Sequence, residues 1–169
     1  MGGCCSRDIK RKNFIETSKK NEDFKKKFEY ISTLGDGSFG KVKLFRDRLV
    51  HDMKFAIKTM KKSEMGVDLI ECLKHEVEVL KKLDHPNIVK YFDTYEDEGS
   101  IHIVMEYIPG ENLMQLIKQK KFNKFSENNA SEIVKSLLKA VMFLHRQNII
   151  HRDIKPDNIL FSTTGYTLI

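Results

Sequence analysis

The sequence predicts an α+β fold in which short strands and one helix precede a mainly helical part. Five strand-like runs fall between residues 28 and 106, and a single stretch of helical period interrupts them. A long amphipathic helix is predicted after residue 126. Hydrophobic residues make up 40% of the 169 residues and include 11 Phe, so the chain has the apolar bulk of a folded domain.

The predicted strands form two groups separated by a helix. Their residues alternate in polarity or form short apolar runs bounded by turn residues. The helix covers residues 64–83 and ends before Pro86, which cannot continue it. The strands are predicted at residues 28–34, 41–45 and 53–60 before the helix, and at residues 88–95 and 100–106 after it.

Two further helices are predicted in the last third of the chain. A short one covers residues 112–119, and a long one covers residues 127–145 with Ser126 as its N-cap. Residues 166–169 have the pattern of a strand that has just begun. The apolar residues of the long helix keep the 3.6-residue period of a buried face, at Ala130, Ile133, Val134, Leu137, Leu138, Val141 and Leu144.

The charge distribution argues against a nucleic-acid-binding protein. Residues 1–27 hold nine Lys or Arg and four Asp or Glu, a net of +5, whereas residues 28–169 hold 21 and 20, a net of +1. Nucleic-acid binding requires basic residues on the folded domain. No run of about 18 apolar residues predicts a membrane span. Three Cys are too few for a disulfide framework or a four-ligand zinc site, so an intracellular protein is expected.

The first residues predict an acylated leader. The run Met1-Gly2-Gly3-Cys4-Cys5-Ser6 fits the N-myristoylation pattern, with Gly2 as the acceptor. Because one myristoyl chain binds membranes only reversibly, a second signal is needed. Palmitoylation of Cys4 and Cys5 would supply it, as would the basic residues of the leader near an anionic leaflet. We expect residues 1–27 to form a tether at the cytoplasmic face of a membrane; the alternatives are a disordered basic tail, or Cys residues used in redox or metal chemistry.

A glycine-rich segment over residues 35–40 predicts a phosphate-binding hairpin. Gly35, Gly37 and Gly40 give the pattern G-x-G-x-x-G, which also occurs in ordinary turns. A dinucleotide-binding fold needs a helix after the third Gly, but residues 41–45 alternate as a strand does. A Walker loop needs Ser or Thr after the Lys, and Val42 stands there. A glycine-rich β-turn over ATP phosphates fits best.

A lysine and a glutamate are predicted to form an ion pair. Lys58 ends the apolar run Phe55-Ala56-Ile57, and Glu76 lies seven residues after Leu69, about 20° from it around the helix. A carboxylate on an apolar face is costly unless it is paired. Each residue alone is more typical of the protein surface, but together they favour a Lys58–Glu76 pair.

The octapeptide His151-Arg152-Asp153-Ile154-Lys155-Pro156-Asp157-Asn158 carries the most specific pattern in the chain. It resembles the catalytic loop of the eukaryotic protein kinases, and the run at residues 85–89 is also typical of that family. In detail the chain is similar to the calcium/calmodulin-dependent group, especially the acylated calcium-dependent kinases of protists and plants. The resemblance covers residues 28–169 and implies a small lobe and hinge over residues 28–108, with a five-stranded antiparallel sheet and one helix. Residues 109–169 would begin a mainly helical large lobe.

The resemblance implies a Ser/Thr protein kinase that uses ATP and Mg²⁺. Asp153 would accept the proton of the substrate hydroxyl, Lys155 would neutralise the γ-phosphate, and Asn158 would bind Mg²⁺. Lys58 and Glu76 would complete the catalytic set, and Glu111 and Asp157 would meet a basic residue of the protein substrate. The implied ATP-binding residues are Leu34, Gly35, Gly37, Gly40, Val42, Ala56, Lys58, the gatekeeper Met105, the hinge residues Glu106 and Ile108, and Leu160.

The family's next motifs, Asp-Phe-Gly and Ala-Pro-Glu, do not occur in these residues. The sequence therefore predicts a truncated catalytic domain that is inactive by itself. The alternative function is that of a membrane-tethered, catalytically inactive fragment that binds nucleotide or competes with an active kinase.

Overall fold

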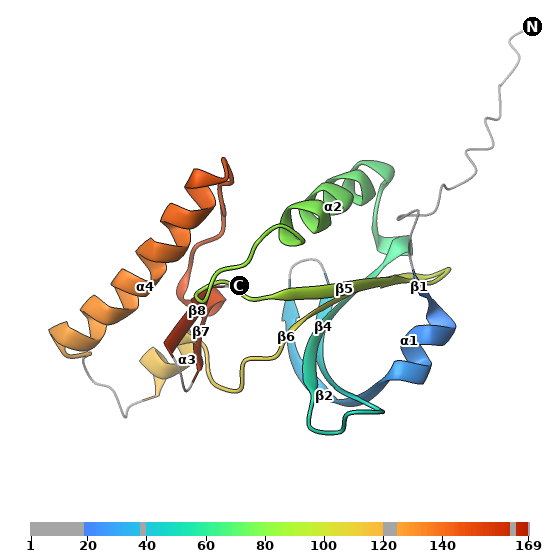
Figure 1. The fold of residues 1–169 in the computed structure, drawn as a ribbon, viewed down its shortest axis with the longest axis horizontal. Helices are drawn as coiled ribbons and strands as arrows, with labels where there is room; N and C mark the ends of the chain where they lie inside the picture. Colours follow the sequence, from blue (N-terminus) through green and yellow to red (C-terminus); the bar gives the residue numbers. More distant parts are fainter. Residues whose placement is uncertain (1–18, 38–39, 120–124, 163–164, 169) are drawn as a thin grey trace, which may run out of the picture.

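The computed structural model describes residues 19–37, 40–119, 125–162 and 165–168. Figure 1 shows two parts joined by the segment that follows β6. One part is a sheet with the helices α1 and α2, and the other contains α3, α4 and a two-stranded sheet. Within the described residues no helix is both long and apolar enough to cross a membrane.

The main sheet contains the five predicted strands in antiparallel pairing. They are β2 (Phe28–Gly37), β3 (Gly40–Asp47), β4 (Lys54–Lys61), β5 (Tyr91–Glu96) and β6 (Ser100–Glu106). The spatial order is β5-β6-β4-β3-β2. A two-residue strand that was not predicted, β1 (Lys19–Lys20), lies parallel to β5 at one edge. The predicted α+β architecture is confirmed.

Both faces of the sheet are covered by apolar side chains. Because side chains alternate along a strand, Ile101 and Ile103 of β6 lie on one face while His102 and Val104 lie on the other. One face packs against α2 through Met60, Leu73, Val77, Ile101 and Ile103. The opposite face packs against α1 through Phe24, Phe28, Phe45, Phe55, Ile57, Tyr95 and Val104.

Helix α1 (Asn21–Lys27) belongs to the folded domain, although the sequence placed residues 21–27 in the tether. Its Phe24 is 7% exposed and contacts the rings of Phe28, Phe45 and Tyr95, with ring centroids 5.3 to 5.6 Å apart. A helix of seven residues is too short to show a hydrophobic period, and Phe24 is the one buried side chain among its described residues 23–27. The folded region therefore begins before Phe28, and residues 1–18 lie outside the described residues.

The helix predicted over residues 64–83 is shorter in the structure, where it begins after Gly66 and ends at Leu80. A 3₁₀ turn, η1 (Lys62–Glu64), precedes Gly66, and α2 (Val67–Leu80) follows it. Glycine is a poor helix former and is tolerated as an N-cap, so the helix starts there. Beyond Leu80 the backbone tightens: the amide of Lys82 donates to Val79 O and that of Leu83 to Leu80 O.

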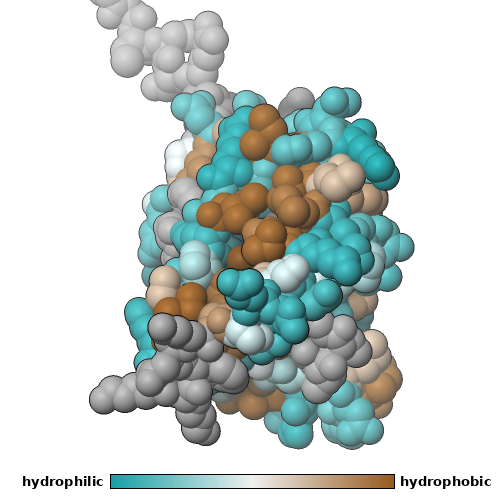
Figure 2. All heavy atoms as spheres, turned by 90° about the vertical axis from the view of Figure 1, so that its left-hand side faces the viewer, coloured by the Kyte–Doolittle hydropathy of each residue, from teal (hydrophilic) through white to brown (hydrophobic). Residues whose placement is uncertain are grey.

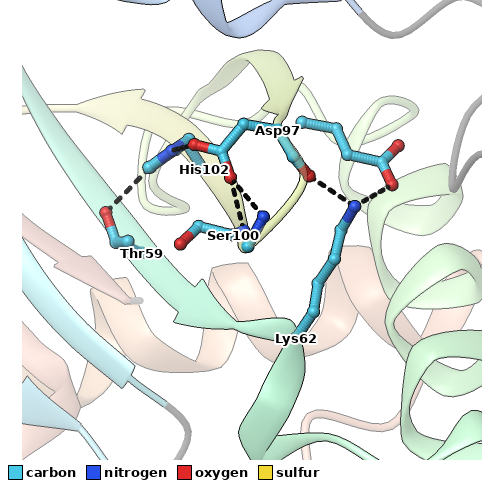
Figure 3. Close-up of polar contacts among 7 residues, drawn as sticks. Thr59, Lys62, Asp97, Ser100 and His102 are labelled. Atoms are coloured by element: carbon cyan, nitrogen blue, oxygen red, sulfur yellow. Dashed lines mark hydrogen bonds and ion pairs between the residues drawn. The ribbon is translucent and has the colours of Figure 1, made fainter.

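A polar cluster fills the end of the sheet near the β5–β6 turn (Figure 3). An oxygen of Asp97 accepts hydrogen bonds from the backbone amides of Gly99 and Ser100, at 2.8 and 2.6 Å. The other carboxylate oxygen lies 3.4 Å from His102 Nε2, and His102 Nδ1 lies 3.0 Å from Thr59 Oγ1. The imidazole, which is largely buried, therefore has a polar partner at each nitrogen.

The second part begins with α3 (Leu113–Lys118) and α4 (Glu127–Arg146). Asn112 and Gln115 form a capping box before α3, and Ser126 Oγ accepts a hydrogen bond from Asn129 N at the start of α4. The 3₁₀ turn η2 (Pro156–Asn158) leads into the antiparallel pair of β7 (Ile159–Ser162) and β8 (Gly165–Leu168).

Helix α4 buries one side and exposes apolar residues on another. Ala140 and Leu144 pack with Leu83 and Ile159 in a separate cluster. Val134, Leu138 and Met142 follow each other at four-residue spacing and are 51 to 54% exposed. Apolar side chains gather on this side of the molecule, as Figure 2 shows. The predicted stripe is therefore only partly buried here.

Candidate active site

The glycine-rich hairpin joins β2 to β3 as predicted. Gly35 pairs with Val42 and Gly37 with Gly40, whereas residues 38–39 lie outside the described residues. Gly40 has φ +140°, and a Cβ there would collide with the carbonyl oxygen of Thr59. Only glycine allows the hairpin to lie this close to β4. At Gly35 an added Cβ would meet open space.

The register of the sheet places several predicted nucleotide-binding residues on one face. Val42 of β3 pairs with Lys58 of β4, and Ala56, two residues before Lys58, pairs with Met105 of β6. Residues two apart or directly paired share a face, so these four side chains lie on the side covered by α2. Met105 also packs against the buried cluster of that side.

A pocket of about 260 Å³ lies beside this face, between β4 and α2. Two of the predicted catalytic residues, Lys58 and Glu76, line it together with Gly40. The structure thus brings the hairpin, the strand lysine and the helix glutamate to one cavity. The other described lining residues are Met60, Lys61, Glu64, Met65, Leu69, Cys72 and Leu73.

The predicted Lys58–Glu76 ion pair is not formed in this structure. Among the described residues, the ion pairs of this region join Lys61 to Glu64 and Lys62 to Glu96 instead. The side chain of Glu76 is exposed, because Leu73 and Val77 are the α2 residues that face the sheet. Glu76 shares its helix side with Leu69, but that side borders the pocket and solvent.

The hinge segment follows β6. The Glu106 amide donates to Lys90 O at 2.8 Å, and the Glu106 carboxylate accepts from Lys90 N at 3.4 Å. Ile108 is buried, whereas Leu34, at the opposite side of the sheet, is exposed. Leu160 of β7 forms an isolated bridge with Asn112, which connects the segment after the hinge to the second part.

The predicted catalytic loop forms a compact hydrogen-bonded unit around Asp153. Lys155 Nζ and Asn158 Nδ2 both contact Asp153 Oδ2, at 2.9 Å each, and Asn158 Nδ2 also donates to the Asp153 carbonyl at 2.8 Å. The Asp153 amide donates to His151 Nδ1 at 3.3 Å. Hydrogen bonds from Lys155 and then from Asn158 lower the pKa of Asp153, so this carboxylate is ionised at neutral pH.

Backbone conformation sets this arrangement. Arg152 has φ +67°, a left-handed conformation that is uncommon for a residue other than glycine. Pro156 opens η2, and Asn158 N donates to Lys155 O at 2.9 Å, which closes a tight turn. This turn brings Asn158 back into contact with Asp153, which lies five residues earlier in the chain. Residues held in rarely populated backbone conformations cluster at functional sites.

The oxygen atoms of this loop suit a hard divalent cation. Mg²⁺ binds carboxylate, amide and phosphate oxygens. Since Asn158 uses its NH₂ group on Asp153, its amide oxygen remains a possible ligand. The described residues contain no group of three or more His, Cys, Asp or Glu that would hold a metal by itself. The loop therefore fits a metal held jointly with phosphate groups of a ligand.

Residues 28–169 match the family model of the protein kinase domain. The chain belongs to the protein kinase family. It is 40% identical over 162 residues to calcium-dependent protein kinase 6 of Plasmodium berghei, covering 94% of this chain and 10% of that kinase. It is 37% identical over 141 residues to myosin light chain kinase A of Dictyostelium discoideum, covering 83% of this chain and 47% of that kinase.

A third relative is calcium/calmodulin-dependent protein kinase type 1 of Caenorhabditis elegans. The chain is 36% identical to it over 142 residues, which cover 83% of this chain and 40% of that kinase. The chain thus spans between a tenth and about half of the length of these relatives. They place it among the Ser/Thr protein kinases of the calcium/calmodulin-dependent group, a family that generally uses ATP and Mg²⁺.

The predicted catalytic residues lie in two separate parts of the structure, the pocket of the small lobe and the loop around Asp153. The described residues that line the pocket all come from the small lobe, and Asp153, Lys155 and Asn158 are not among them. The catalytic loop is assembled internally, but it does not border that cavity. The roles of these residues in catalysis remain predictions.

Two contacts near the kinase hinge were not anticipated. A Cβ at Gly110 would collide with the carbonyl oxygen of Phe161, and Phe161 N donates to Glu111 O at 3.1 Å. The carboxylate of Glu111, predicted to meet a basic substrate residue, accepts a hydrogen bond from Gln119. Pro109-Gly110 indicates a turn in the sequence, but no local pattern reveals its distant partner.

Proposed function

We propose that this chain is the nucleotide-binding and catalytic-loop region of a protein kinase that transfers the γ-phosphate of ATP to Ser or Thr hydroxyls of proteins. The observation that carries the proposal is the hydrogen-bonded unit of Asp153, Lys155 and Asn158. Phosphoryl transfer depends mainly on positioning and on neutralising charge. A carboxylate with an ammonium and an amide each within 3 Å of it provides both functions.

In the proposed mechanism Asp153 accepts the hydrogen bond of the substrate hydroxyl and orients its oxygen toward the γ-phosphorus. The P–O bond to that oxygen forms as the bond to ADP breaks, and the hydroxyl proton passes to Asp153. The lowered pKa of Asp153 keeps it ionised and able to accept. Lys155 and Lys58 neutralise phosphate charge, and the hairpin glycines let backbone amides approach it. Asn158 would be one ligand of a Mg²⁺ ion, which would neutralise further phosphate charge when bound.

A rearrangement of α2 is part of this proposal. Lys58 and Glu76 line the same pocket without pairing, and kinase activity requires that pair. A small rotation of α2 toward β4 would bring Glu76 to Lys58. Its solvent-facing position supports such a movement, because no buried contact of Glu76 has to be broken.

The deciding experiment is Asp153→Asn in a protein that carries the whole kinase domain. We expect kcat for transfer to a Ser/Thr peptide to fall by about 10² or more, with little change in ATP affinity. The matched control is Asp84→Asn, because the Asp84 side chain is exposed and lies far from the loop in sequence. Unchanged turnover in Asp153→Asn would exclude Asp153 as the proton acceptor.

The second candidate function is a catalytically inactive fragment that binds nucleotide or competes with an active kinase. The exposed apolar residues of α4 and the unpaired Lys58 favour it for residues 1–169 alone. Calorimetric ATP binding together with peptide phosphorylation distinguishes the two functions. Binding without transfer by residues 1–169 supports the fragment, and turnover above that of Lys58→Met supports the enzyme.

We also propose attachment to the cytoplasmic face of a membrane through myristoylated Gly2 and palmitoylated Cys4 and Cys5, which lie outside the described residues. The sequence pattern and the basic leader support this proposal. In cells, Gly2→Ala should move the protein to the soluble fraction, and joint replacement of both Cys should leave weak, salt-sensitive binding. Gly3→Ala is the matched control. Full membrane retention of Gly2→Ala would contradict acylation at Gly2.

For the substrate, we propose a preference for proteins with a basic residue near the acceptor. Asp157 is exposed next to the catalytic loop and supports this preference. Glu111 contributes less, because Gln119 already engages its carboxylate.

A further inference from the structure

The connection between β3 and β4, residues 48–53, exposes aliphatic side chains at its tip. Leu49 is 88% exposed and Val50 is 51% exposed. Met53, which ends the connection, is also exposed. A single exposed apolar residue is ordinary, but successive large apolar side chains are unusual at the solvent-exposed tip of a hairpin.

The tip is held in a defined conformation. Asp47 is buried, and its Oδ1 accepts hydrogen bonds from the amides of Leu49 and Val50 at 2.8 and 3.1 Å. The amide of Asp47 donates to Met53 O, and that of Met53 donates to Val50 O, at 2.9 Å each. The apolar side chains are therefore presented by a fixed turn, so little conformational entropy is lost when they bind.

Basic side chains surround this tip. The amide of Arg48 donates to Lys27 O at 2.8 Å and its Nε donates to Lys25 O at 3.2 Å, so the tip is fastened to the last turn of α1. Lys25 and Lys26 on that turn are exposed, as is Lys54 at the other end of the connection.

The acidic residues nearby are largely engaged with other groups. Glu29 pairs with Arg46 at 3.0 Å and with Arg48 at 4.0 Å, and Asp47 binds backbone amides. Asp23 and Asp52 are exposed and partly offset the positive charge. By formal charge the described segments 23–29 and 46–54 hold six Lys or Arg and four Asp or Glu, so the surface around the tip has a net positive charge.

We propose that Leu49 and Val50, with Arg48, Lys25 and Lys26, form a surface that contacts an anionic lipid membrane. Stable protein interfaces bury roughly 800 Å² on each partner, which is more than one hairpin tip offers. Aliphatic side chains with flanking cations match the boundary between headgroups and acyl chains.

This inference deepens the proposed membrane association and adds a contact that needs no acyl chain. The 18 residues before β1 span at most about 60 Å when extended, which is enough for the leader and the hairpin tip to meet one bilayer. Two attachments would fix the orientation of the small lobe at the membrane.

The chain contains no Trp, so one introduced Trp reports on its own position. The test uses unacylated residues 1–169 carrying Gly2→Ala and either Leu49→Trp or, as the control, Leu138→Trp on α4, a residue that is likewise exposed, at 53%. Vesicles contain phosphatidylcholine alone or with 30% phosphatidylserine. We expect a blue shift of the Leu49→Trp emission only with phosphatidylserine, and no shift for Leu138→Trp.

A second variant measures affinity. Replacing Leu49 and Val50 together by Ser should lower partition onto phosphatidylserine vesicles about tenfold in a sedimentation assay, with an unchanged circular dichroism spectrum. An unshifted Leu49→Trp spectrum on vesicles that still bind the chain would overturn the proposal, because the leader would then account for binding. A shift that depends on protein concentration without vesicles would also overturn it, in favour of self-association.

Discussion

Phe24 of α1 stacks on the imidazole ring of His102 in β6, with ring centroids 4.3 Å apart and ring planes 13° apart. His102 in turn contacts Thr59 of β4 and Asp97 of the β5–β6 turn. One aromatic residue therefore connects the N-terminal helix to the polar cluster of the small lobe. The stability of that lobe depends on residues that precede the part matched by the kinase family model.

Phe24→Ala should destabilise the small lobe by about 3–4 kcal/mol, because the ring is buried among four other aromatic rings. Chemical denaturation followed by circular dichroism measures the change. Lys25→Ala, one residue away and exposed, is the control and should stay within about 0.5 kcal/mol. Equal stability of the two variants would show that α1 is not docked in solution.

The stability of the small lobe should fall as the pH falls from 7 to 5. Burial lowers the pKa of His102, and the contact with Asp97 only partly opposes this, so the folded state holds the neutral imidazole. Below the ordinary pKa of about 6.5 the unfolded chain binds a proton that the folded chain does not, and stability is lost. His102→Asn should reduce the fall of the melting temperature between pH 7 and pH 5.

His85 serves as the comparison for this pH dependence. Burial, with a smaller effect of Lys139, also lowers the pKa of His85. His85→Asn should therefore remove its own share of the pH effect and leave that of His102 in place. An identical pH profile for the wild-type chain and His102→Asn would mean that the imidazole is accessible to protons in the folded state.

Gly40→Ala should distort the glycine-rich hairpin, whereas Gly35→Ala should not. The first substitution places a Cβ against the Thr59 carbonyl at φ +140°, and the second meets open space. Strain of this kind costs about 1–3 kcal/mol. We expect Gly40→Ala to lower the melting temperature and the ATP affinity, measured by calorimetry. Equal effects of both substitutions would contradict the close approach of residue 40 to β4.

Glu76→Gln should lower kinase activity without lowering the stability of the fold. Because Glu76 is exposed and unpaired with Lys58 here, the substitution should change the free energy of unfolding by less than about 0.5 kcal/mol. In a protein with the whole kinase domain it should nevertheless lower kcat by tenfold or more, since the active arrangement needs the pair. Glu78→Gln, on the same helix, is the control. A large loss of stability in Glu76→Gln would indicate that the pair forms in the resting state.

Strand periodicity and the kinase-like motifs predicted most of the architecture. Pairs such as Ala56 with Met105 follow from alternation once the strands are aligned, and the octapeptide around Asp153 closes on itself locally. Local patterns therefore sufficed where the contacts are local or periodic.

Two of the features that sequence reasoning missed depend on distant partners, and a third depends on one backbone position. Phe24 stands alone in a charged segment, and only the aromatic cluster of the sheet explains its burial. The exposure of the Glu76 side chain depends on how α2 packs against β4, and helical spacing does not determine that packing. The start of α2 after Gly66 depends on a single backbone position, which a period over 20 residues conceals.

The approach of Gly110 to Phe161 has a consequence for the order of folding. It closes a loop of about 50 residues that holds α3, α4 and the catalytic segment, at a chain-entropy cost of about 3–4 kcal/mol. Helix α4 forms from local contacts within about a microsecond, but loop closure must wait until β7 exists. On a ribosome, Asp153 and its neighbours would therefore reach their final positions well after the small lobe has folded.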